Sequence, residues 1–195
     1  MNFLAHFHLA WPDEGMIAGG LEGDFFKGPL PGKLPHSLER GVKLHRAIDA
    51  YTDNHELVAT LRWHFPAPLR RYAGILIDLS FDHFLTRHWC KYSEIGLKDF
   101  NQQICTILNQ QDAQLSEGSR RMLNRIQEYD ILNLYHDWDT VTATAMRVGE
   151  RFKRGNPLLE VETQLSPIKR ELEQTFLEFY PQLLTFSDIQ RRQLT

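Results

Sequence analysis

Histidine and aspartate residues recur at intervals of four in the first half of this chain. One series is His45, Asp49 and Asp53, and a second is Asp78 and Asp82 with His83 adjoining. Because residues four apart lie on one face of an α-helix, each series brings its side chains together. Carboxylates beside imidazoles on facing helices are what a helical metal site needs. The pattern predicts a helical fold with a hydrolytic metal centre.

The second series lies in an apolar segment. Asp78 and Asp82 sit within residues 75–85, which are otherwise almost wholly apolar. An acid buried in such a helix is costly unless it is paired or binds a cation. Two readings stay open: a metal or catalytic pair, or acids held in buried ion pairs by arginines. The candidate arginines are Arg70, Arg71 and Arg87.

Apolar periodicity and capping signals predict helices along most of the chain. There is no alternating strand pattern and no internal repeat, and 195 residues suffice for one sizeable core. We therefore predict an all-α, single-domain helical bundle that spans residues 1–195. The predicted helices cover residues 36–64 (with Ser37 as N-cap), 69–92, 97–111, 117–129, 139–152 (with Asp139 as N-cap) and a last long helix that starts at Ser166-Pro167.

Composition narrows the function classes. The two cysteines, Cys90 and Cys105, form no Cys-x-x-Cys, so a metal would be held by histidine and carboxylate, which favours Mn, Mg, Fe or Zn. A net charge of -3 argues against nucleic-acid binding. The mean hydropathy is -0.40, and no apolar run is long enough for a membrane span. With no basic leader at the N-terminus, we expect a cytoplasmic protein without membrane contact.

His45 and Asp49 could bind one divalent cation, the histidine through nitrogen and the aspartate through oxygen. Arg46 points about a quarter-turn away and could grip a phosphate through two hydrogen bonds. The alternative is a surface His–Asp pair beside a solvated arginine.

Asp24 lies in the string Gly23-Asp24-Phe25-Phe26-Lys27-Gly28. Its glycines allow close backbone approach, and Lys27 could meet a phosphate. Taken alone, such a string is more often a simple turn.

His6 and His8 would lie on nearly opposite faces of a helix, so at most one of them is a ligand if this segment is helical. Either could instead be a hydrogen-bonded core histidine. The sequence has no nucleophile elbow, P-loop or dinucleotide fingerprint, which disfavours serine-based acyl transfer and nucleotide-driven chemistry.

Several of these strings together resemble the acyl carrier protein phosphodiesterase family of Gram-negative bacteria. Their order and spacing match over roughly residues 2–90, and the second half matches mainly in its helical character. The strings are Asn2-Phe3-Leu4-Ala5-His6-x-His8-Leu9-Ala10, Gly23-Asp24-Phe25, His45-Arg46-x-Ile48-Asp49, Thr52-Asp53, Asp78-x-x-x-Asp82-His83-Phe84-Leu85 and Arg87-x-Trp89.

The resemblance implies a manganese-dependent hydrolase of an HD-phosphohydrolase-like, all-α fold, although Asp82-His83 reverses the usual HD order. Its substrate would be holo acyl carrier protein, and its products apo carrier protein and 4′-phosphopantetheine. A divalent metal would polarise the phosphodiester and supply hydroxide near neutral pH.

On this reading the residues take distinct roles. Asp24, His45 and Arg46 would be catalytic, and Lys27 and Arg46 would neutralise the substrate phosphate. The metal would be held by Asp24, His45, Asp49, Asp78 and Asp82, with His6 and His83 in reserve. Because carrier proteins are acidic, a basic docking face is expected. Its candidates are Arg40, Lys43, Arg62, Arg70, Arg71 and Arg87.

Three other readings remain. The chain could be an HD-like phosphohydrolase of a nucleotide or another small phosphodiester. It could be a non-catalytic helical module that binds a carrier protein, with its carboxylates in structural ion pairs. A haem-binding bundle that uses His6 or His45 as axial ligand is the most distant.

Overall fold

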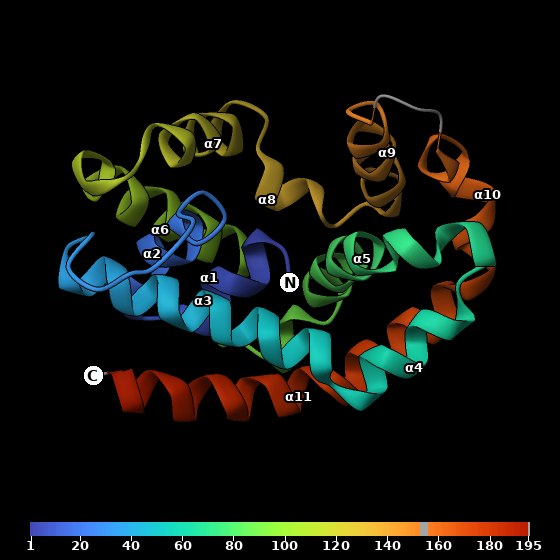
Figure 1. Cartoon of the computed structure of the whole chain (residues 1–195), viewed down its shortest axis with the longest axis horizontal. Coiled ribbons are helices and arrows are strands. Elements are labelled where there is room, and N and C mark those ends of the chain that lie inside the picture. Colours follow the sequence, from blue (N-terminus) through green and yellow to red (C-terminus); the bar gives the residue numbers. More distant parts are fainter. Residues whose placement is uncertain (153–155, 195) are drawn as a thin grey trace.

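The computed structural model describes residues 1–152 and 156–194, and every regular element within them is a helix. Figure 1 shows the long last helix along one side of the molecule, with the chain's start near the centre. The α-helices are α1 Phe3–Ala10, α2 Glu14–Glu22, α3 His36–Asn54, α4 Glu56–His64, α5 Ala73–Arg87, α6 Leu97–Gln110, α7 Glu117–Glu128, α8 Ile131–Leu134, α9 Trp138–Gly149, α10 Val161–Leu165 and α11 Lys169–Leu194. Short 3₁₀ helices are η1 Ala67–Tyr72, η2 Trp89–Lys91, η3 Asp112–Gln114, η4 Pro157–Glu160 and η5 Ser166–Ile168.

Helices α2 and α3 pack unusually closely because glycine faces glycine. A Cβ atom added to Gly19 would lie 2.5 Å from the Cα of Gly41, and one added to Gly41 would lie 2.7 Å from the Cα of Gly19. No side chain fits between these backbones. The close approach brings the segment that follows α2 alongside the middle of α3, where His45 lies.

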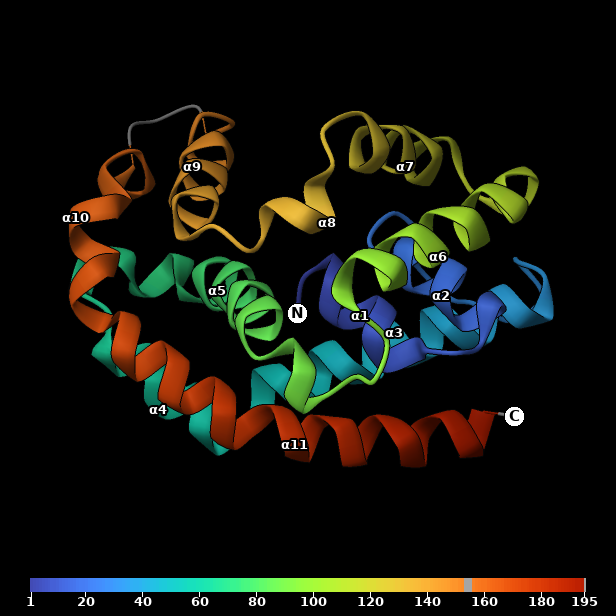
Figure 2. The same ribbon diagram turned by 180° about the vertical axis from the view of Figure 1, so that it is seen from behind.

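The core is centred on aromatic side chains of α5 and α11. Phe81 and Phe84 are fully buried and contact Phe176, and Phe81 also contacts Phe179. Burying a side chain of this size contributes roughly 1.5–3 kcal/mol. Helix α11 also lies against α3 and α4, so it ties the two parts of the first half together (Figure 2).

Helices α7, α8 and α9 form a row on the side opposite α11, and α6 lies between α7 and α2 (Figures 1 and 2). Helix α6 lies against α2, and the ring centroid of its Phe100 lies 6.0 Å from that of His8 on α1 and 5.3 Å from that of Trp11, which follows α1. No described helix is long and apolar enough to cross a lipid bilayer.

The all-α prediction is confirmed, and helices 97–111 and 117–129 are observed within a residue or two. The predicted helix 36–64 is wrong as a single element. It breaks at His55, which ends α3 and whose ring Nδ1 accepts from the backbone of Leu57 at the start of α4. A histidine that caps by its ring leaves no sequence signal of the usual kind.

Other helix ends also differ. Ser37 is not the N-cap of α3, because the helix already begins at His36 after Pro35. The segment predicted as one helix over 69–92 divides into η1, α5 and η2. Helix α9 is capped by Asp137 rather than Asp139, and α11 begins at Lys169 after the turn at Ser166-Pro167.

Candidate metal centre

Three side chains, from α1 and α3, converge beside the amino group of Met1. The Asp49 carboxylate on α3 has Oδ1 3.1 Å from His6 Nε2 and Oδ2 3.1 Å from His45 Nε2. The two imidazole rings stack with centroids 3.9 Å apart. Within the described residues, this is the one group of three histidine, cysteine or acidic side chains whose ligand atoms all lie within 4.8 Å of one another. Two imidazoles and a carboxylate are a donor set suited to a divalent transition metal.

The backbone explains how His45 reaches this position. His45 and Asp49 are one turn apart on α3, and His45 is buried beneath the end of α2. A Cβ atom at Gly23 would lie 2.4 Å from Cγ of His45. Glycine at this position therefore leaves the space that the imidazole ring occupies.

Asp82 holds α1, and with it His6, in place. Its two carboxylate oxygens accept from the backbone N–H groups of Leu4 (2.9 Å) and Ala5 (3.1 Å) in the first turn of α1. A carboxylate from a distant helix thus serves as the cap that Asn2 does not provide through its own side chain. Burial raises the pKa of Asp82 to about 7, against the lowering effect of these two hydrogen bonds.

Two more carboxylates border the cluster. Asp24 Oδ1 lies 3.9 Å from His45 Nε2, and Asp78 Oδ1 lies 3.0 Å from the amino group of Met1, which is also 3.3 Å from Asp49. Asp24, Asp49 and Asp78 are each partly exposed, by 37–47% of the side chain, so one edge of the cluster is open to solvent.

The pKa values favour the protonation states that a cation needs. Burial, and then the neighbouring His45, lower the pKa of His6 to about 3. Burial opposes ionisation of Asp49, but the two adjacent imidazoles outweigh it and hold its pKa well below the usual range. Near neutral pH, His6 is therefore neutral and Asp49 is charged, which are the metal-ligating forms.

The acids at the rim behave differently. Burial and the charge of Asp49 raise the pKa of Asp24, although His45 partly opposes this. Burial likewise raises the pKa of Asp78, against the effect of the nearby amino group. Carboxyl groups with raised pKa values at the open edge of a site are suited to hold or move a proton.

His6 also has buried nitrogen atoms without hydrogen-bond partners among the described residues. Neither of its buried ring nitrogens makes a well-aligned hydrogen bond to a described residue, and Nδ1 of His45 lacks one too. Buried polar atoms without partners are uncommon in folded proteins. A metal bound at Nε2 of His6 would supply a partner at the point nearest Asp49.

The predicted phosphate-binding residues lie beside the cluster. Arg46 donates to the carbonyl oxygens of Phe26 and Gly28 at 3.0 Å, so its guanidinium secures the loop after Asp24. Lys27 lies on that loop and is exposed. Lys27 is thus exposed on a loop whose position Arg46 secures.

His83, a predicted reserve ligand, is not one of the three residues of the cluster. Its Nδ1 is 2.9 Å from the carbonyl oxygen of Tyr135, and its ring packs edge-on against Trp138. Burial lowers its pKa to about 4.

His8, on the opposite face of α1 from His6, contacts the hydroxyl of Tyr180 at 2.8 Å. The sequence rule that only one of His6 and His8 could be a ligand fits this arrangement.

The six candidate docking cations divide by their contacts. Arg40 pairs with Asp13 at 2.8 Å and Arg62 with Asp53 at 2.7 Å. The others are exposed, and two of them lie against aromatic rings: Lys43, Arg70 (over Trp63), Arg71 (over Tyr72) and Arg87.

Sequence reasoning missed the supports of the Asp24 loop. Glu22 accepts from the hydroxyl of Ser119 (2.6 Å) and the backbone of Ser116 (3.0 Å), and Phe25 packs where a Cβ on Gly118 would stand. These contacts join residues almost a hundred positions apart, and no local spacing signals them.

Comparison with known proteins identifies the family of this chain. The family model described as acyl carrier protein phosphodiesterase matches residues 1–183. Curated relatives named acyl carrier protein phosphodiesterase, from Shigella boydii serotype 18 and Escherichia coli O157:H7, are each 33% identical over 189 residues. The alignments cover 94% of this chain and 96% of each relative. No solved structure matches, so the expected likeness to HD phosphohydrolases stays a prediction. Family model and relatives, over nearly the full length, place this chain in the acyl carrier protein phosphodiesterase family.

Proposed function

We propose that this chain is a metal-dependent phosphodiesterase that hydrolyses holo acyl carrier protein to apo carrier protein and 4′-phosphopantetheine. One observation carries the proposal: the carboxylate of Asp49 contacts, with one oxygen each, the Nε2 atoms of two buried, stacked imidazoles from different helices. The family and the names of the relatives support the substrate.

His6, His45 and Asp49 would hold the metal, which we propose to be Mn²⁺. Their donor types fit it, and the unmet nitrogens of His6 support the assignment. In this proposal Asp24 and Asp78 border the ligand set and carry protons rather than binding the metal, and Asp82 holds α1. When bound, such a metal polarises a phosphoryl oxygen and lowers the pKa of a bound water.

The chain's own residues would do the rest. The phosphodiester enters at the open edge between Asp24 and Asp78. Asp24, with its raised pKa, can deliver a proton to the departing serine oxygen of the carrier. Lys27 neutralises phosphate charge from the loop that Arg46 secures.

The carrier protein would be recognised through charge. Lys43, Arg70, Arg71 and Arg87 are exposed and available to an acidic surface, while Arg40 and Arg62 already have acidic partners. Complementary charge mainly speeds association. Such a substrate places the reaction in the cytoplasm, without nucleic acid or membrane as partner.

The test is to incubate the purified chain with holo acyl carrier protein and Mn²⁺ and weigh the carrier by intact-protein mass spectrometry. We expect the carrier to lose the phosphopantetheine mass with wild type and to keep it with Asp24→Ala. A variant at Asp112, a residue remote from this centre in the turn η3, is the matched control: Asp112→Ala should act like wild type. An unchanged carrier with folded, metal-loaded wild type, together with hydrolysis of a small phosphodiester, would instead favour a small-molecule phosphohydrolase.

A further inference from the structure

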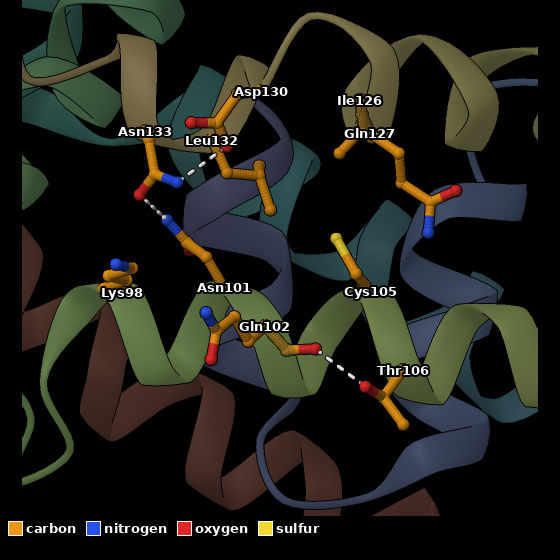
Figure 3. Close-up of a pocket in the computed structure, with 10 residues that line it drawn as sticks. All are labelled: Lys98, Asn101, Gln102, Cys105, Thr106, Ile126, Gln127, Asp130, Leu132 and Asn133. Carbon is orange, nitrogen blue, oxygen red and sulfur yellow. Dashed lines mark hydrogen bonds between the residues drawn. The ribbon is translucent and has the colours of Figure 1, made fainter.

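A second site lies between α6 and the turn that joins α7 to α8. It is a groove of about 590 Å³, within the size range of small-molecule pockets. Figure 3 shows Asn101 and Cys105 on α6 facing Ile126, Leu132 and Asn133 across it. Asn101, Ile126 and Leu132 are buried, whereas the rim residues are polar and exposed. The metal centre uses none of these residues.

Three polar side chains of the groove form a chain of hydrogen bonds whose direction is fixed (Figure 3). Asn133 Nδ2 donates to Asp130 Oδ1 at 2.6 Å, and Asn101 Nδ2 donates to Asn133 Oδ1 at 2.8 Å. A carboxylate only accepts hydrogen bonds, so Asn133 must turn its amide nitrogen toward Asp130. Its oxygen then faces Asn101, which must in turn offer its own nitrogen. The direction of both amides follows from Asp130.

The consequence is a free acceptor. Asn101 is only 4% exposed, and its Oδ1 has no hydrogen-bond partner among the described residues. Leaving a buried acceptor unpaired is costly. The groove therefore calls for a ligand that brings an N–H or O–H donor to Asn101.

The other residues that line the groove indicate which kind of ligand fits it. The side-chain amides of Gln102 and Gln127 lie at the rim, and Ile126, Leu132 and Cys105 supply apolar surface. A chain that alternates amide groups with short apolar stretches matches such a lining. We propose that this groove binds the pantetheine chain, which carries two amides and a terminal thiol. This inference rests on the proposed function, since pantetheine is part of the proposed substrate and product.

Two contacts connect the groove to the metal centre. Two residues beyond Asn133, the hydroxyl of Tyr135 accepts from Nδ2 of Asn2 at 2.9 Å. Asn2 adjoins Met1, whose amino group lies 3.3 Å from Asp49. The segment that follows Asn133 of the groove is thus hydrogen-bonded to the N-terminal end of α1, the helix that carries His6. The pantetheine could come from the arm of the holo carrier or from the free product.

The chain offers an internal control for a labelling experiment. Cys105 is half-buried in the groove and Cys90 is exposed outside it. Burial raises the pKa of the Cys105 thiol, so without binding Cys90 should react first. Pantethine, the disulfide of pantetheine, is the probe. The attacking thiolate forms a mixed disulfide with one pantetheine and releases the other as its thiol.

We expect pantethine to label Cys105 several-fold faster than Cys90, as read by peptide mass spectrometry of the full chain. Bis(2-hydroxyethyl) disulfide, which lacks amides, should label Cys90 first. Asn101→Leu should abolish the preference for Cys105. Free 4′-phosphopantetheine should slow Cys105 labelling of wild type, a result that needs no variant. Equal or faster labelling of Cys90 by pantethine would overturn the proposal.

Turnover separates the two sources of pantetheine. If the substrate arm occupies the groove, Asn101→Leu raises KM for holo carrier and leaves kcat unchanged. If the free product occupies it, KM stays the same and inhibition by 4′-phosphopantetheine weakens. No change in either would contradict the proposal. Selective labelling of Cys105 in a chain that fails to hydrolyse holo carrier would remove the proposed function and leave pantetheine recognition standing. Hydrolysis of holo carrier without selective labelling of Cys105 would support the proposed function and remove pantetheine recognition by the groove.

Discussion

His6 and His45 belong to different helices, yet their imidazole rings stack nearly parallel, with an interplanar angle of 16° and centroids 3.9 Å apart. The stacking turns both Nε2 atoms toward the Asp49 carboxylate. It also requires at least one neutral ring, because two imidazolium ions at this distance would repel each other. The arrangement is thus organised for a cation between the side chains rather than for protonated histidines.

Asp49→Asn should abolish metal binding at little cost to the fold. The amide keeps the shape of the carboxylate and removes the charge that lies between the two imidazoles. We expect hydrolysis of holo carrier to fall by at least about 100-fold. Bound manganese, measured by elemental analysis after desalting, should fall with it.

The matched control is Asp53→Asn, one turn further along α3, where the aspartate is exposed and paired with Arg62. It should keep metal content and activity within about twofold of wild type, as surface ion pairs contribute little. Equal losses in both variants would show that negative charge on α3, and not the position of Asp49, matters.

Gly23→Ala should disable the site without touching a functional group. The added methyl would stand 2.4 Å from Cγ of His45, so the ring must leave its position beside Asp49. We expect activity and metal affinity each to fall by about 10-fold or more. The control is Gly74→Ala on α5, where a Cβ meets nothing within 4 Å. That variant should retain activity, and a crystal structure of Gly23→Ala with an unmoved His45 would refute this account of the glycine.

Asp82→Ala should loosen the start of α1. Its carboxylate accepts two buried N–H groups, and leaving them unpaired costs about 1–3 kcal/mol. The free energy of unfolding by urea should fall by about this amount, and activity should fall through misplacement of His6. Asp82→Asn keeps one acceptor oxygen and should lose less. If Asp82 were instead a metal ligand, Asn and Ala would lose metal content equally with little change in stability.

His8 makes folding stability depend on pH. Burial lowers its pKa from 6.5 to about 4. Above pH 6.5 the side chain is neutral in both states, so its contribution is fully present. As the pH falls from 6.5 to about 4, only the unfolded chain takes up the proton, and stability declines. The loss attributable to His8 is at most on the order of 3 kcal/mol.

The check is chemical denaturation at pH 7.5 and pH 5 for wild type and His8→Gln. The variant should lose less stability between the two values than wild type does. The same change at exposed His136 serves as the control and should leave the pH dependence of wild type intact. A His8→Gln variant with the full wild-type decline would assign the effect to other groups.

Most of the helices, and the pairing of His45 with Asp49, could be predicted from the sequence for one reason: both depend on local spacing. His45 and Asp49 are one turn apart, so their common face follows from helical geometry. The sequence could say only that at most one of His6 and His8 is a metal ligand, because the direction in which each side chain points depends on how α1 packs. The break at His55 escaped prediction since it rests on a ring acting as a cap.

Long-range contacts account for what could not be predicted. Asp82 was a natural candidate ligand by its apolar surroundings, but its partners are backbone N–H groups of α1, which a pattern of side chains cannot reveal. Arg46 likewise has the residue type of a phosphate clamp, and carbonyl oxygens of the Asp24 loop occupy its donors. In both cases the sequence indicated that the side chain needs a polar partner, but the tertiary fold determines which group that partner is.

The most direct test of the central claim is the position of bound manganese. Crystals of the chain grown with Mn²⁺ would be measured with X-rays near the manganese absorption edge, where the ion gives an anomalous signal. We predict a peak at ligand distance from Nε2 of His6, Nε2 of His45 and a carboxylate oxygen of Asp49. A fully occupied peak away from these three residues, or none in a crystal whose protein hydrolyses holo carrier, would contradict the metal centre described here.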